Sequence, residues 1–462
     1  MAGATVFDSQ LFGNIFGTEE IRTCFSERAY VARLIQAECA LAQAEEDEGV
    51  IPEGTAAAIR AHSDVANVNW PVLAEKTEIV GYPILPLVEQ MVTWVPGEAA
   101  GYIHWGATTQ DIMDLASTLQ MKQGLEIVSQ HLSRLERTLT RMSGEYRDVP
   151  MAGRTHLQHA LPVTFGYKCA VWLAGIRRQL RRLRDIQDTC LMVQFGGAAG
   201  TLASLGTGDA GIRVRKRLAQ ILSLNDPVIT WHVARDTVAE VVSFLAILGG
   251  SLAKIGLDLI VMSSNELNEV AEPFVPHRGA SSTMPQKRNP ISSEIMLAQS
   301  KILRAQAGLV LDSMVSDFER ASGPWHLEWA AIPVSFISAV GSLHQADFAL
   351  SGLQVNQDAM LANLKSTKGL IVAEAVMMKL GRHTGRQQAH DIVYAACTKA
   401  LDSNSTLQAT LSESKEVTTH FTTEELAELC DPTKYLGSSQ LMVDELLGRQ
   451  QNGIANGTNG TK

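Results

Sequence analysis

The sequence predicts an all-α protein organised around several long helices, and three observations support this class. Between residues 112 and 147 the apolar residues step by alternating threes and fours, a 3.5-residue repeat typical of a coiled-coil-like helix. A second run, 237–268, is apolar on more than one helical face. No run alternates between apolar and polar residues well enough to predict a strand. The apolar residues of the repeat are Leu125, Val128, Leu132, Leu135, Leu139 and Met142.

Residues 1–111 are expected to form an N-terminal helical domain. Residues 19–48 carry apolar side chains at helical spacing and end in acidic residues before Gly49. Residues 70–96 contain four prolines, so the helices there are expected to be short or interrupted.

Residues 112–364 are expected to form a central long-helix bundle domain that also carries a catalytic loop. The run 237–268 would make a helix of roughly 45 Å at 1.5 Å per residue. A helix that is apolar nearly all round is buried on several sides, so we expect subunits to share one bundle in a homotetramer. The predicted helices of this domain cover 112–147, 168–194, 237–268, 292–314 and 333–349.

The remaining chain is expected to form a C-terminal helical domain over residues 365–449, because its amphipathic segments become shorter. The tail 450–462 contains Asn-Gly three times and is predicted to be disordered.

Composition excludes some classes of function. The net charge of −10 over 462 residues gives no support for binding to nucleic acid or to an anionic membrane surface. The six cysteines have no zinc-ligand spacing and are interpreted as buried thiols in a reducing compartment. No secretory signal is recognisable at the N-terminus. The apolar run 238–262 contains three charged residues and is interpreted as a buried helix rather than a membrane span. We therefore expect a cytoplasmic protein.

Three polar segments interrupt the helical pattern at expected helix boundaries: 104–114, 153–162 and 280–290. The third carries hydroxyls, a lysine, an arginine and an asparagine, a set suited to binding a carboxylate, and its flanking Gly279 and Pro290 suit a lid that moves. Each segment also has an ordinary interpretation as a helix cap or a polar connection. His156 and His159 have a spacing that could bind a metal, but no third ligand is apparent, so no metal and no cofactor are expected.

Taken together, the three segments resemble the motif regions of the fumarase/aspartase superfamily in order and in spacing. The resemblance continues through residues 196–206, 231–236 and 319–329, and so covers nearly the whole chain. The matching stretches are SSTMPQKRNP, similar to SSxMPxKxNP; HWGATTQDIMD, similar to HxGxTSxDxxD with Thr109 at the usual Ser; and GRTHLQ, similar to GRTHxQ.

This resemblance implies a lyase that removes a proton next to a substrate carboxylate, through an aci-carboxylate carbanion. Ser281 would be the base and His156 the acid, with Glu294 orienting the imidazole ring. It also implies a homotetramer in which three subunits contribute to each active site, acting on a small anionic carboxylate. The substrate-binding residues that it implies are His104, Thr108, Thr109, Gln158, Lys287, Asn289, Arg235 and Arg320.

Within the superfamily, the segment 104–114 and the stretch 325–329 look most like the 3-carboxy-cis,cis-muconate cycloisomerase branch. Adenylosuccinate lyases usually carry a serine and a second arginine near that stretch, to hold a nucleotide phosphate. Two departures complicate the cycloisomerase interpretation: His156 occupies a position that can be Trp in that branch, and Ala234 replaces a Gln that is common to both branches. The alternatives are a C–N lyase that releases fumarate from a substituted aspartate, and a catalytically inactive structural homologue. The retained Ser281, His156, Lys287 and Glu294 argue against the inactive homologue.

Overall fold

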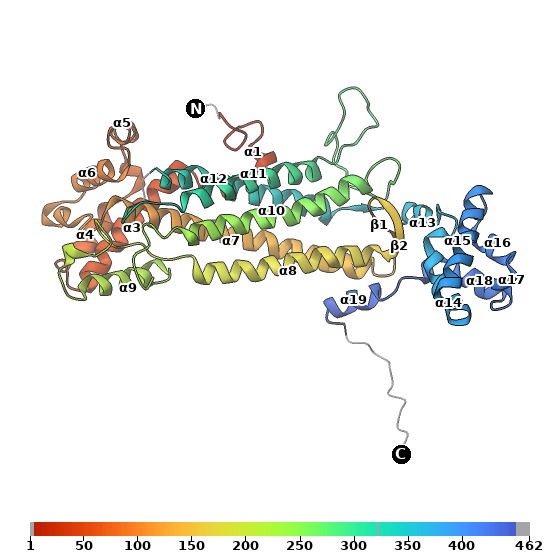
Figure 1. Ribbon diagram of the computed structural model, residues 1–462. Helices are drawn as coiled ribbons and strands as arrows, with labels where there is room; N and C mark the ends of the chain where they lie inside the picture. The colour runs from red at the N-terminus through yellow and green to blue at the C-terminus, as the bar shows by residue number, and fades with distance from the viewer. Residues whose placement is uncertain (1–3, 321–322, 450–462) are drawn as a thin grey trace, which may run out of the picture. The chain divides into compact units, whose positions relative to one another are not determined.

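The structure is a computed structural model that describes residues 4–320 and 323–449 (Figure 1). Helices dominate the described chain, which confirms the predicted all-α class. The predicted tail at 450–462 lies outside the described residues. The α-helices are α1 (Gly13–Phe16), α2 (Glu19–Cys24), α3 (Glu27–Asp47), α4 (Thr55–His62), α5 (Trp70–Val80), α6 (Ile84–Trp94), α7 (Thr109–Glu145), α8 (Phe165–Thr189), α9 (Ala210–Leu222), α10 (Asp236–Met262), α11 (Ile291–Ser313), α12 (Trp325–Ser351), α13 (Gln357–Lys365), α14 (Ala373–Thr384), α15 (Arg386–Asp402), α16 (Leu407–Ser412), α17 (Lys415–Thr418), α18 (Thr423–Leu429) and α19 (Ser439–Leu446). Short 3₁₀ turns cover Val65–Asn67, Gly97–Tyr102, Ala203–Leu205, Leu370–Val372 and Pro432–Lys434, and the strands are β1 (Pro150–Thr155), β2 (Gln158–Thr164), β3 (Val270–Ala271) and β4 (Gln354–Val355).

The described chain forms two compact units, each assembled from three separate stretches of sequence. The predicted domains were contiguous, with bounds at residues 111 and 364, and those bounds stay predictions. Of the described residues, the first unit takes those within 1–133, 178–254 and 295–346, and the second takes those within 134–177, 255–294 and 347–449.

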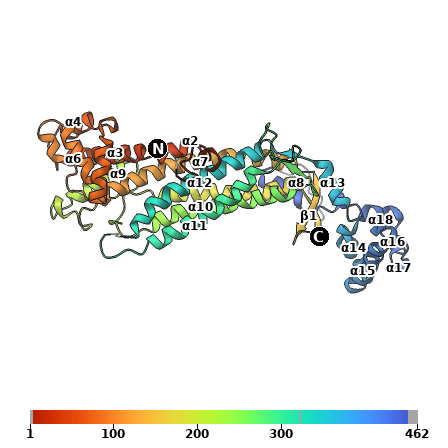
Figure 2. The same ribbon diagram turned by 90° about the horizontal axis from the view of Figure 1, so that it is seen from above.

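In the first unit, α3 packs against α4 and α9 over an apolar core (Figure 2). The helix begins after Ser26, whose hydroxyl accepts a hydrogen bond from the backbone N–H of Ala29, a standard N-cap. Its buried face carries apolar residues but also two carboxyl groups, Glu38 and Glu45, at 2% and 0% exposure. Buried carboxyl groups on an apolar helix face are uncommon unless they have a partner.

The long helices follow the predicted repeats closely. The six residues of the 3.5-residue repeat are all at most 1% exposed on α7, so the repeat marks the buried face of that helix. The segment predicted as one helix over 237–268 ends at Met262 in α10, and a turn follows in which Asn268 has a φ of 48°. Within the first unit, the long helices lie side by side (Figures 1 and 2).

Among the described helices, α10 alone is long and apolar enough to cross a membrane, by length and composition only, and 44% of its most apolar window is buried. Its exposed face follows a 3-4-3-4 spacing. Ile247 and Leu257 lie on this face and are 51% and 50% exposed. The residues of the face are Glu240, Ser243, Ile247, Gly250, Lys254, Leu257 and Val261.

The second unit contains a β-hairpin that the sequence did not predict. Strands β1 and β2 pair antiparallel, with Thr155 opposite Gln158. The two residues between them, His156 and Leu157, have φ values of 52° and 61°, and two positive φ values are what a two-residue type I′ hairpin turn requires. The predicted all-helical pattern is therefore wrong here: the segment 153–162 lies in a hairpin and not at a helix boundary.

Candidate functional site

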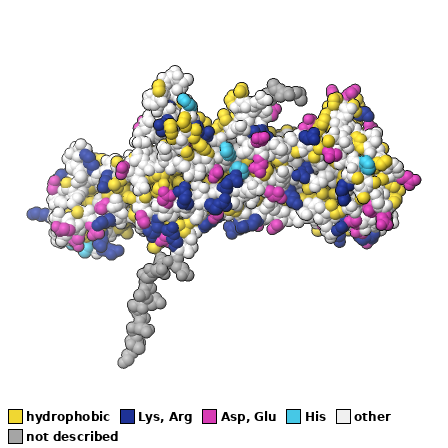
Figure 3. Space-filling model, turned by 180° about the vertical axis from the view of Figure 1, so that it is seen from behind, with side chains coloured by type: hydrophobic (Ala, Val, Ile, Leu, Met, Phe, Trp, Pro, Cys, Tyr) yellow, Lys and Arg dark blue, Asp and Glu magenta, His cyan; other side chains and the backbone are white. Residues whose placement is uncertain are grey.

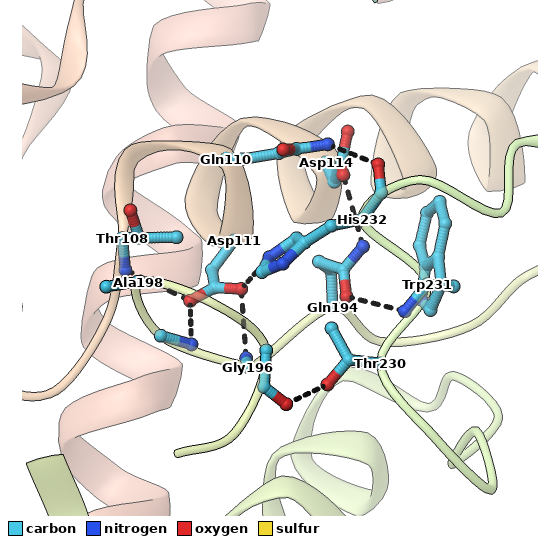
Figure 4. Close-up of polar contacts among 12 residues, drawn as sticks. Thr108, Gln110, Asp111, Asp114, Gln194, Gly196, Ala198, Thr230, Trp231 and His232 are labelled. Carbon is cyan, nitrogen blue, oxygen red and sulfur yellow. Dashed lines mark hydrogen bonds and ion pairs between the residues drawn. The ribbon is translucent and has the colours of Figure 1, made fainter. Parts of the chain in front are cut away.

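The first unit brings distant segments together around the carboxylate of Asp111, in the first turn of α7 (Figure 4). Asp111 is fully buried. Its Oδ1 accepts hydrogen bonds from the backbone N–H of Gly196 at 3.0 Å and from Nε2 of His232 at 2.7 Å. Its Oδ2 accepts from the backbone N–H of Thr108 at 3.0 Å and of Gly197 at 2.9 Å. One carboxylate thus fixes the segment before α7, the glycine-rich segment 196–206 and the segment before α10.

A second buried network lies one helical turn further along α7. The guanidinium of Arg235 forms two hydrogen bonds to Asp114, both at 2.9 Å, and two to Glu328, at 2.9 and 2.6 Å. All three side chains are at most 3% exposed. Burial alone lowers the pKa of Arg235, but the two carboxylates outweigh it and raise that pKa.

The substrate-binding role predicted for Arg235 stays a prediction, and the geometry around this residue bears on it. Its donors are directed at two carboxylates of its own chain, and it is buried with them. The arrangement favours a structural role, in which Arg235 neutralises charges that burial would otherwise make costly.

Arg320 and Thr108, both predicted to bind substrate, lie in contact. Nη2 of Arg320 donates to Oγ1 of Thr108 at 2.9 Å and to the backbone carbonyl of Ala198 at 2.7 Å. Thr109 is the first residue of α7. A guanidinium, a hydroxyl and a helix N-terminus that meet in this way suit the binding of an anion.

His104 lies before α7 on the same segment as Thr108, and its side chain is held by a residue of α3. Its Nδ1 is 2.7 Å from Oε1 of Glu38 on α3. Two residues later, the backbone carbonyl of Gly106 accepts a hydrogen bond from Oγ of Ser204 at 3.3 Å. The segment 104–108 is therefore tied down at three points, through His104, Gly106 and Thr108.

In the second unit, the segment 280–290 is a loop before α11, as predicted, and it stands out from the helices beside it (Figures 1 and 3). Oγ of Ser281 accepts hydrogen bonds from the backbone N–H groups of Thr283 at 3.3 Å and Met284 at 3.1 Å. Lys287 is exposed on the same loop. A hydroxyl that accepts two backbone donors is better able to carry negative charge than a free one.

Asn289, predicted to bind substrate, forms hydrogen bonds within its own loop. Its backbone N–H and its Nδ2 both donate to the carbonyl of Gly279, at 3.0 and 3.1 Å. Ala280 and Arg288 form an isolated antiparallel bridge beside it. The amide of Asn289 therefore closes the base of the loop.

The hairpin and α11 carry the other predicted catalytic residues. His156 and Gln158 are exposed at the hairpin turn, and Glu294 is exposed in the first turn of α11. Within the described part of the second unit, no hydrogen bond joins His156 to Glu294, so one chain does not form the predicted pair. The neighbouring Arg154 is held by the buried Glu269, at 3.0 and 2.6 Å.

The predicted site residues thus divide between the two units. The described residues contain no cluster of three or more His, Cys, Asp or Glu side chains that could hold a metal ion. The first unit carries His104, Thr108, Thr109, Arg235 and Arg320, and the second carries His156, Gln158, Ser281, Lys287, Asn289 and Glu294.

Sequence reasoning missed the carboxylates that hold these segments. Asp111 lies inside the first motif, yet its partners other than Thr108 are 85 to 121 residues away in the chain. The sequence did contain a signal that Glu38 has a special role. Glu38 lies on the apolar face of a predicted helix, and its neighbours in the sequence are alanine, cysteine and leucine. A carboxyl group on such a face needs a partner or a proton.

Comparisons with known proteins give consistent matches. A family model described as "Lyase" matches residues 16–303, and one described as "Adenylosuccinate lyase C-terminus" matches residues 369–446. Trans-aconitate decarboxylase 1 of Mycosarcoma maydis is 44% identical over 94% of this chain and 88% of its own length. The 3-carboxy-cis,cis-muconate cycloisomerase of Acinetobacter baylyi is 39% identical over 95% of this chain and 98% of its own. The N-acetyl-S-(2-succino)cysteine lyase of Dickeya dadantii is 37% identical over 96% of this chain and 97% of its own.

Among solved structures, the crystal structure of a fumarate lyase from Mesorhizobium sp. BNC1 is similar to this one. Its TM-score is 0.89, with 49% sequence identity, over 94% of this chain and 99% of that chain. The likeness therefore extends over both compact units.

Proposed function

This chain belongs to the fumarase/aspartase superfamily of lyases, and from that premise we propose that it acts on a polycarboxylate through an aci-carboxylate carbanion, in the manner of a 3-carboxy-cis,cis-muconate cycloisomerase. Lyase chemistry is common to its relatives; the substrate and the residue roles are our proposal. We place the protein in the cytoplasm, where its six free cysteines would stay reduced.

Two relatives support an unsaturated tricarboxylate as the substrate. The names of the relatives from Mycosarcoma and Acinetobacter contain trans-aconitate and 3-carboxymuconate, both of which are unsaturated tricarboxylates. A substrate with three negative charges needs local positive charge in a protein whose net charge is −10. Arg320 and Lys287 would supply it, with His104, Thr108, Thr109 and Gln158 as further donors.

The observation that carries this proposal is the pair of backbone N–H groups that donate to Oγ of Ser281. In the elimination direction, Ser281 takes the proton from the carbon next to a substrate carboxylate, and the electron pair is held as the aci-carboxylate. That pair then forms the double bond as the leaving group departs with a proton from His156. In the lactone-forming direction, a substrate carboxylate adds to the double bond, and the carbanion receives its proton from Ser281.

Shared active sites in a homotetramer would supply the contacts that one chain lacks. His156 and Glu294 are both exposed and do not meet within the described second unit. A neighbouring subunit would bring a second copy of these side chains, so that Glu294 of one subunit could orient His156 of another. Asn289 would serve by holding the loop closed rather than by binding substrate.

An alternative reaction is the elimination of an amine or a thiol from a substituted succinate, with release of fumarate. The relative from Dickeya favours it, because its name specifies a 2-succino group on cysteine sulfur. Decarboxylation is a further candidate, supported by the relative from Mycosarcoma. All three reactions act on a carbon that bears or adjoins a carboxylate.

A three-substrate experiment separates these reactions. The purified protein is incubated with 3-carboxy-cis,cis-muconate, trans-aconitate and N-acetyl-S-(2-succino)cysteine, and products are followed by proton NMR together with released CO₂. We expect loss of one of the two muconate double bonds with formation of a lactone. Fumarate from the succinylated thiol, or CO₂ from trans-aconitate, without any lactone would replace the cycloisomerase proposal by the corresponding alternative.

A further inference from the structure

The contact between His104 and Glu38 joins a predicted substrate-binding residue to a buried carboxyl group. Nδ1 of the imidazole lies 2.7 Å from Oε1 of Glu38, the length of a charge-assisted hydrogen bond. The side chain of Glu38 is 1% exposed, whereas that of His104 is 22% exposed. The imidazole therefore contacts a buried acceptor while its side chain stays partly exposed.

The backbone of His104 adds a second sign that its position is specific. Its φ is 64°, in the left-handed region that a residue with a side chain seldom adopts. Such a conformation persists only where surrounding contacts maintain it. Here those contacts are the hydrogen bond to Glu38 and the anchoring of Gly106 and Thr108 on the same segment.

The charged groups around His104 favour its protonated form. Burial lowers the pKa of the imidazole, but the carboxylate of Glu38, its hydrogen bond and the charge of Asp111 together outweigh burial and raise that pKa. Glu38 lies on α3 and Asp111 on α7, so carboxylates from two helices act on the ring.

Glu45 lies on α3 as well, two turns after Glu38, and shows what a carboxyl group does there without a partner. It is fully buried, and neither of its oxygens has a hydrogen-bond partner among the described residues. Burial, and secondly the charge of Glu38, raise the pKa of Glu45 to about 9. Glu45 is therefore uncharged at neutral pH, and Glu38 is the carboxylate of α3 that faces His104.

We propose that Glu38 is a positioning residue that fixes the ring of His104 through Nδ1 and keeps it cationic, so that Nε2 offers the substrate a charged N–H donor and not a proton acceptor. This rests on the proposed function in one respect, because it requires an anionic carboxylate ligand at the segment 104–108. It assigns His104 to carboxylate binding and separates it from the proton transfers given to Ser281 and His156.

The test measures binding without turnover. Tricarballylate has three carboxylates and neither a double bond nor a leaving group, so it reports on the anion site alone. Its affinity is measured by titration calorimetry of the whole protein between pH 6 and pH 8, in two buffers of different ionisation enthalpy, which gives the protons taken up per site.

The variant Glu38→Gln keeps the side-chain shape and removes the charge. We expect it to bind tricarballylate at least about tenfold more weakly than the wild type at pH 8, and to recover as the pH falls, because its imidazole must then be protonated on binding. Proton uptake at pH 8 should rise toward one per site. Glu45→Gln is the matched control and should keep the wild-type affinity and uptake, because it replaces an already uncharged group.

A double variant separates positioning from mere structural damage. In a His104→Gln background, the further change Glu38→Gln should leave affinity and proton uptake unchanged. Wild-type affinity and uptake in Glu38→Gln would overturn the inference, as would failure of the wild-type protein to bind tricarballylate. Should Glu38→Gln not fold, His104→Gln must weaken binding by a similar factor at pH 6 and at pH 8, because the wild-type ring is cationic at both, and a loss confined to pH 6 would overturn the inference.

A different set of results would refute the proposed function and leave this inference standing. A wild-type protein that binds tricarballylate, and whose Glu38→Gln variant shows the expected loss of affinity and gain of proton uptake, but that turns over none of the three substrates, would refute the proposed reaction and still support the role of Glu38.

Discussion

At the scale of single residues, the proposed reaction depends on how the protein would make the hydroxyl of Ser281 basic enough to take a carbon-bound proton. The alkoxide of Ser281 would be held by the two backbone N–H groups of its own loop. Fixed backbone dipoles stabilise developing charge well, since they need no reorganisation during the reaction.

Replacing Ser281 by alanine should therefore abolish turnover while the protein stays folded and assembled. Loss of one proton-transfer group costs roughly 10²–10⁴-fold in rate. The control is Ser282→Ala, which removes the neighbouring exposed hydroxyl and should keep most of the activity. The measurement compares the steady-state rates of the two variants and the wild type, on whichever of the three substrates the wild type converts fastest. A Ser281→Ala protein with more than about a tenth of the wild-type rate would place the base elsewhere.

The unpartnered carboxyl group of Glu45 predicts a pH-dependent stability. Its pKa in the folded state, about 9, lies above its ordinary value of 4.5. Between these values the unfolded chain binds fewer protons than the folded one, so stability falls as pH rises, by at most about 1.4 kcal/mol per pH unit. Glu45→Gln removes this loss, so its thermal midpoint should exceed that of the wild type increasingly from pH 5 to pH 8. Parallel pH profiles for the two proteins would show that Glu45 has a partner in solution.

At the scale of helices and segments, the buried Asp114–Arg235–Glu328 network joins α7, α12 and the segment before α10. Removing the shared cation leaves two buried carboxylates without a counter-charge. Such a loss typically costs about 3–5 kcal/mol.

Arg235→Ala should accordingly lower the free energy of unfolding by about that amount, as measured by denaturant unfolding. The matched control is Arg213→Ala on α9, which removes a half-exposed partner of Glu48 and should cost about 1 kcal/mol or less. If Arg235→Ala instead keeps its stability and only raises KM, the substrate contact predicted from the sequence would be right after all.

The helices were predictable because their apolar repeats are long and uninterrupted. The prediction of 112–147 differs from α7 (Thr109–Glu145) by only a few residues at each end. The β1–β2 hairpin was not predictable in the same way, since its turn is formed by His156 and Leu157 and not by the glycine or asparagine that usually marks positive φ.

The candidate site was predictable as a set of motifs but not as a set of contacts. Thr108 and Arg320 were both identified, and they meet across 212 residues of sequence. The partners of Arg235 and His104 could not be read from spacing, because Glu328 and Glu38 come from helices that only tertiary packing brings close. The burial of these two carboxyl groups is likewise a result of packing that the sequence does not give.

At the scale of the whole molecule, the exposed face of α10 predicts its environment in the assembly. A 3-4-3-4 stripe that contains half-exposed Ile247 and Leu257 has the spacing of a helix that packs against another helix. We expect a homotetramer with dihedral symmetry in which this face is covered.

The double variant Ile247→Glu/Leu257→Glu should weaken that assembly, because it places four or more like charges around a symmetric contact. Light scattering at micromolar concentration should report smaller species than for the wild type. The control Leu401→Glu changes an exposed leucine of α15 and should leave the assembly unchanged. A wild-type protein that is monomeric and fully active would refute the tetramer.

Subunit mixing tests whether active sites are shared. Ser281→Ala and His156→Ala proteins are each expected to be inactive, yet hybrids of the two would contain some sites with both residues intact. After subunit exchange, confirmed by native mass spectrometry, activity should reappear in proportion to the hybrids. Mixtures that exchange subunits and remain inactive would show that Ser281 and His156 of one chain serve the same site.

The closure of the 280–290 loop at its base has a consequence for selectivity. The backbone N–H and Nδ2 of Asn289 both donate to the carbonyl of Gly279. A Cβ at Gly279 would lie 2.5 Å from the carbonyl oxygen of Asn289. The two ends of the loop are therefore held in close contact. Ser281 and Lys287 both lie between these two ends. With the roles proposed for the two residues, we expect a ligand that offers no carboxylate to Lys287 to fail to engage Ser281 as well. Substrate analogues that lack this carboxylate should therefore lose binding and turnover together.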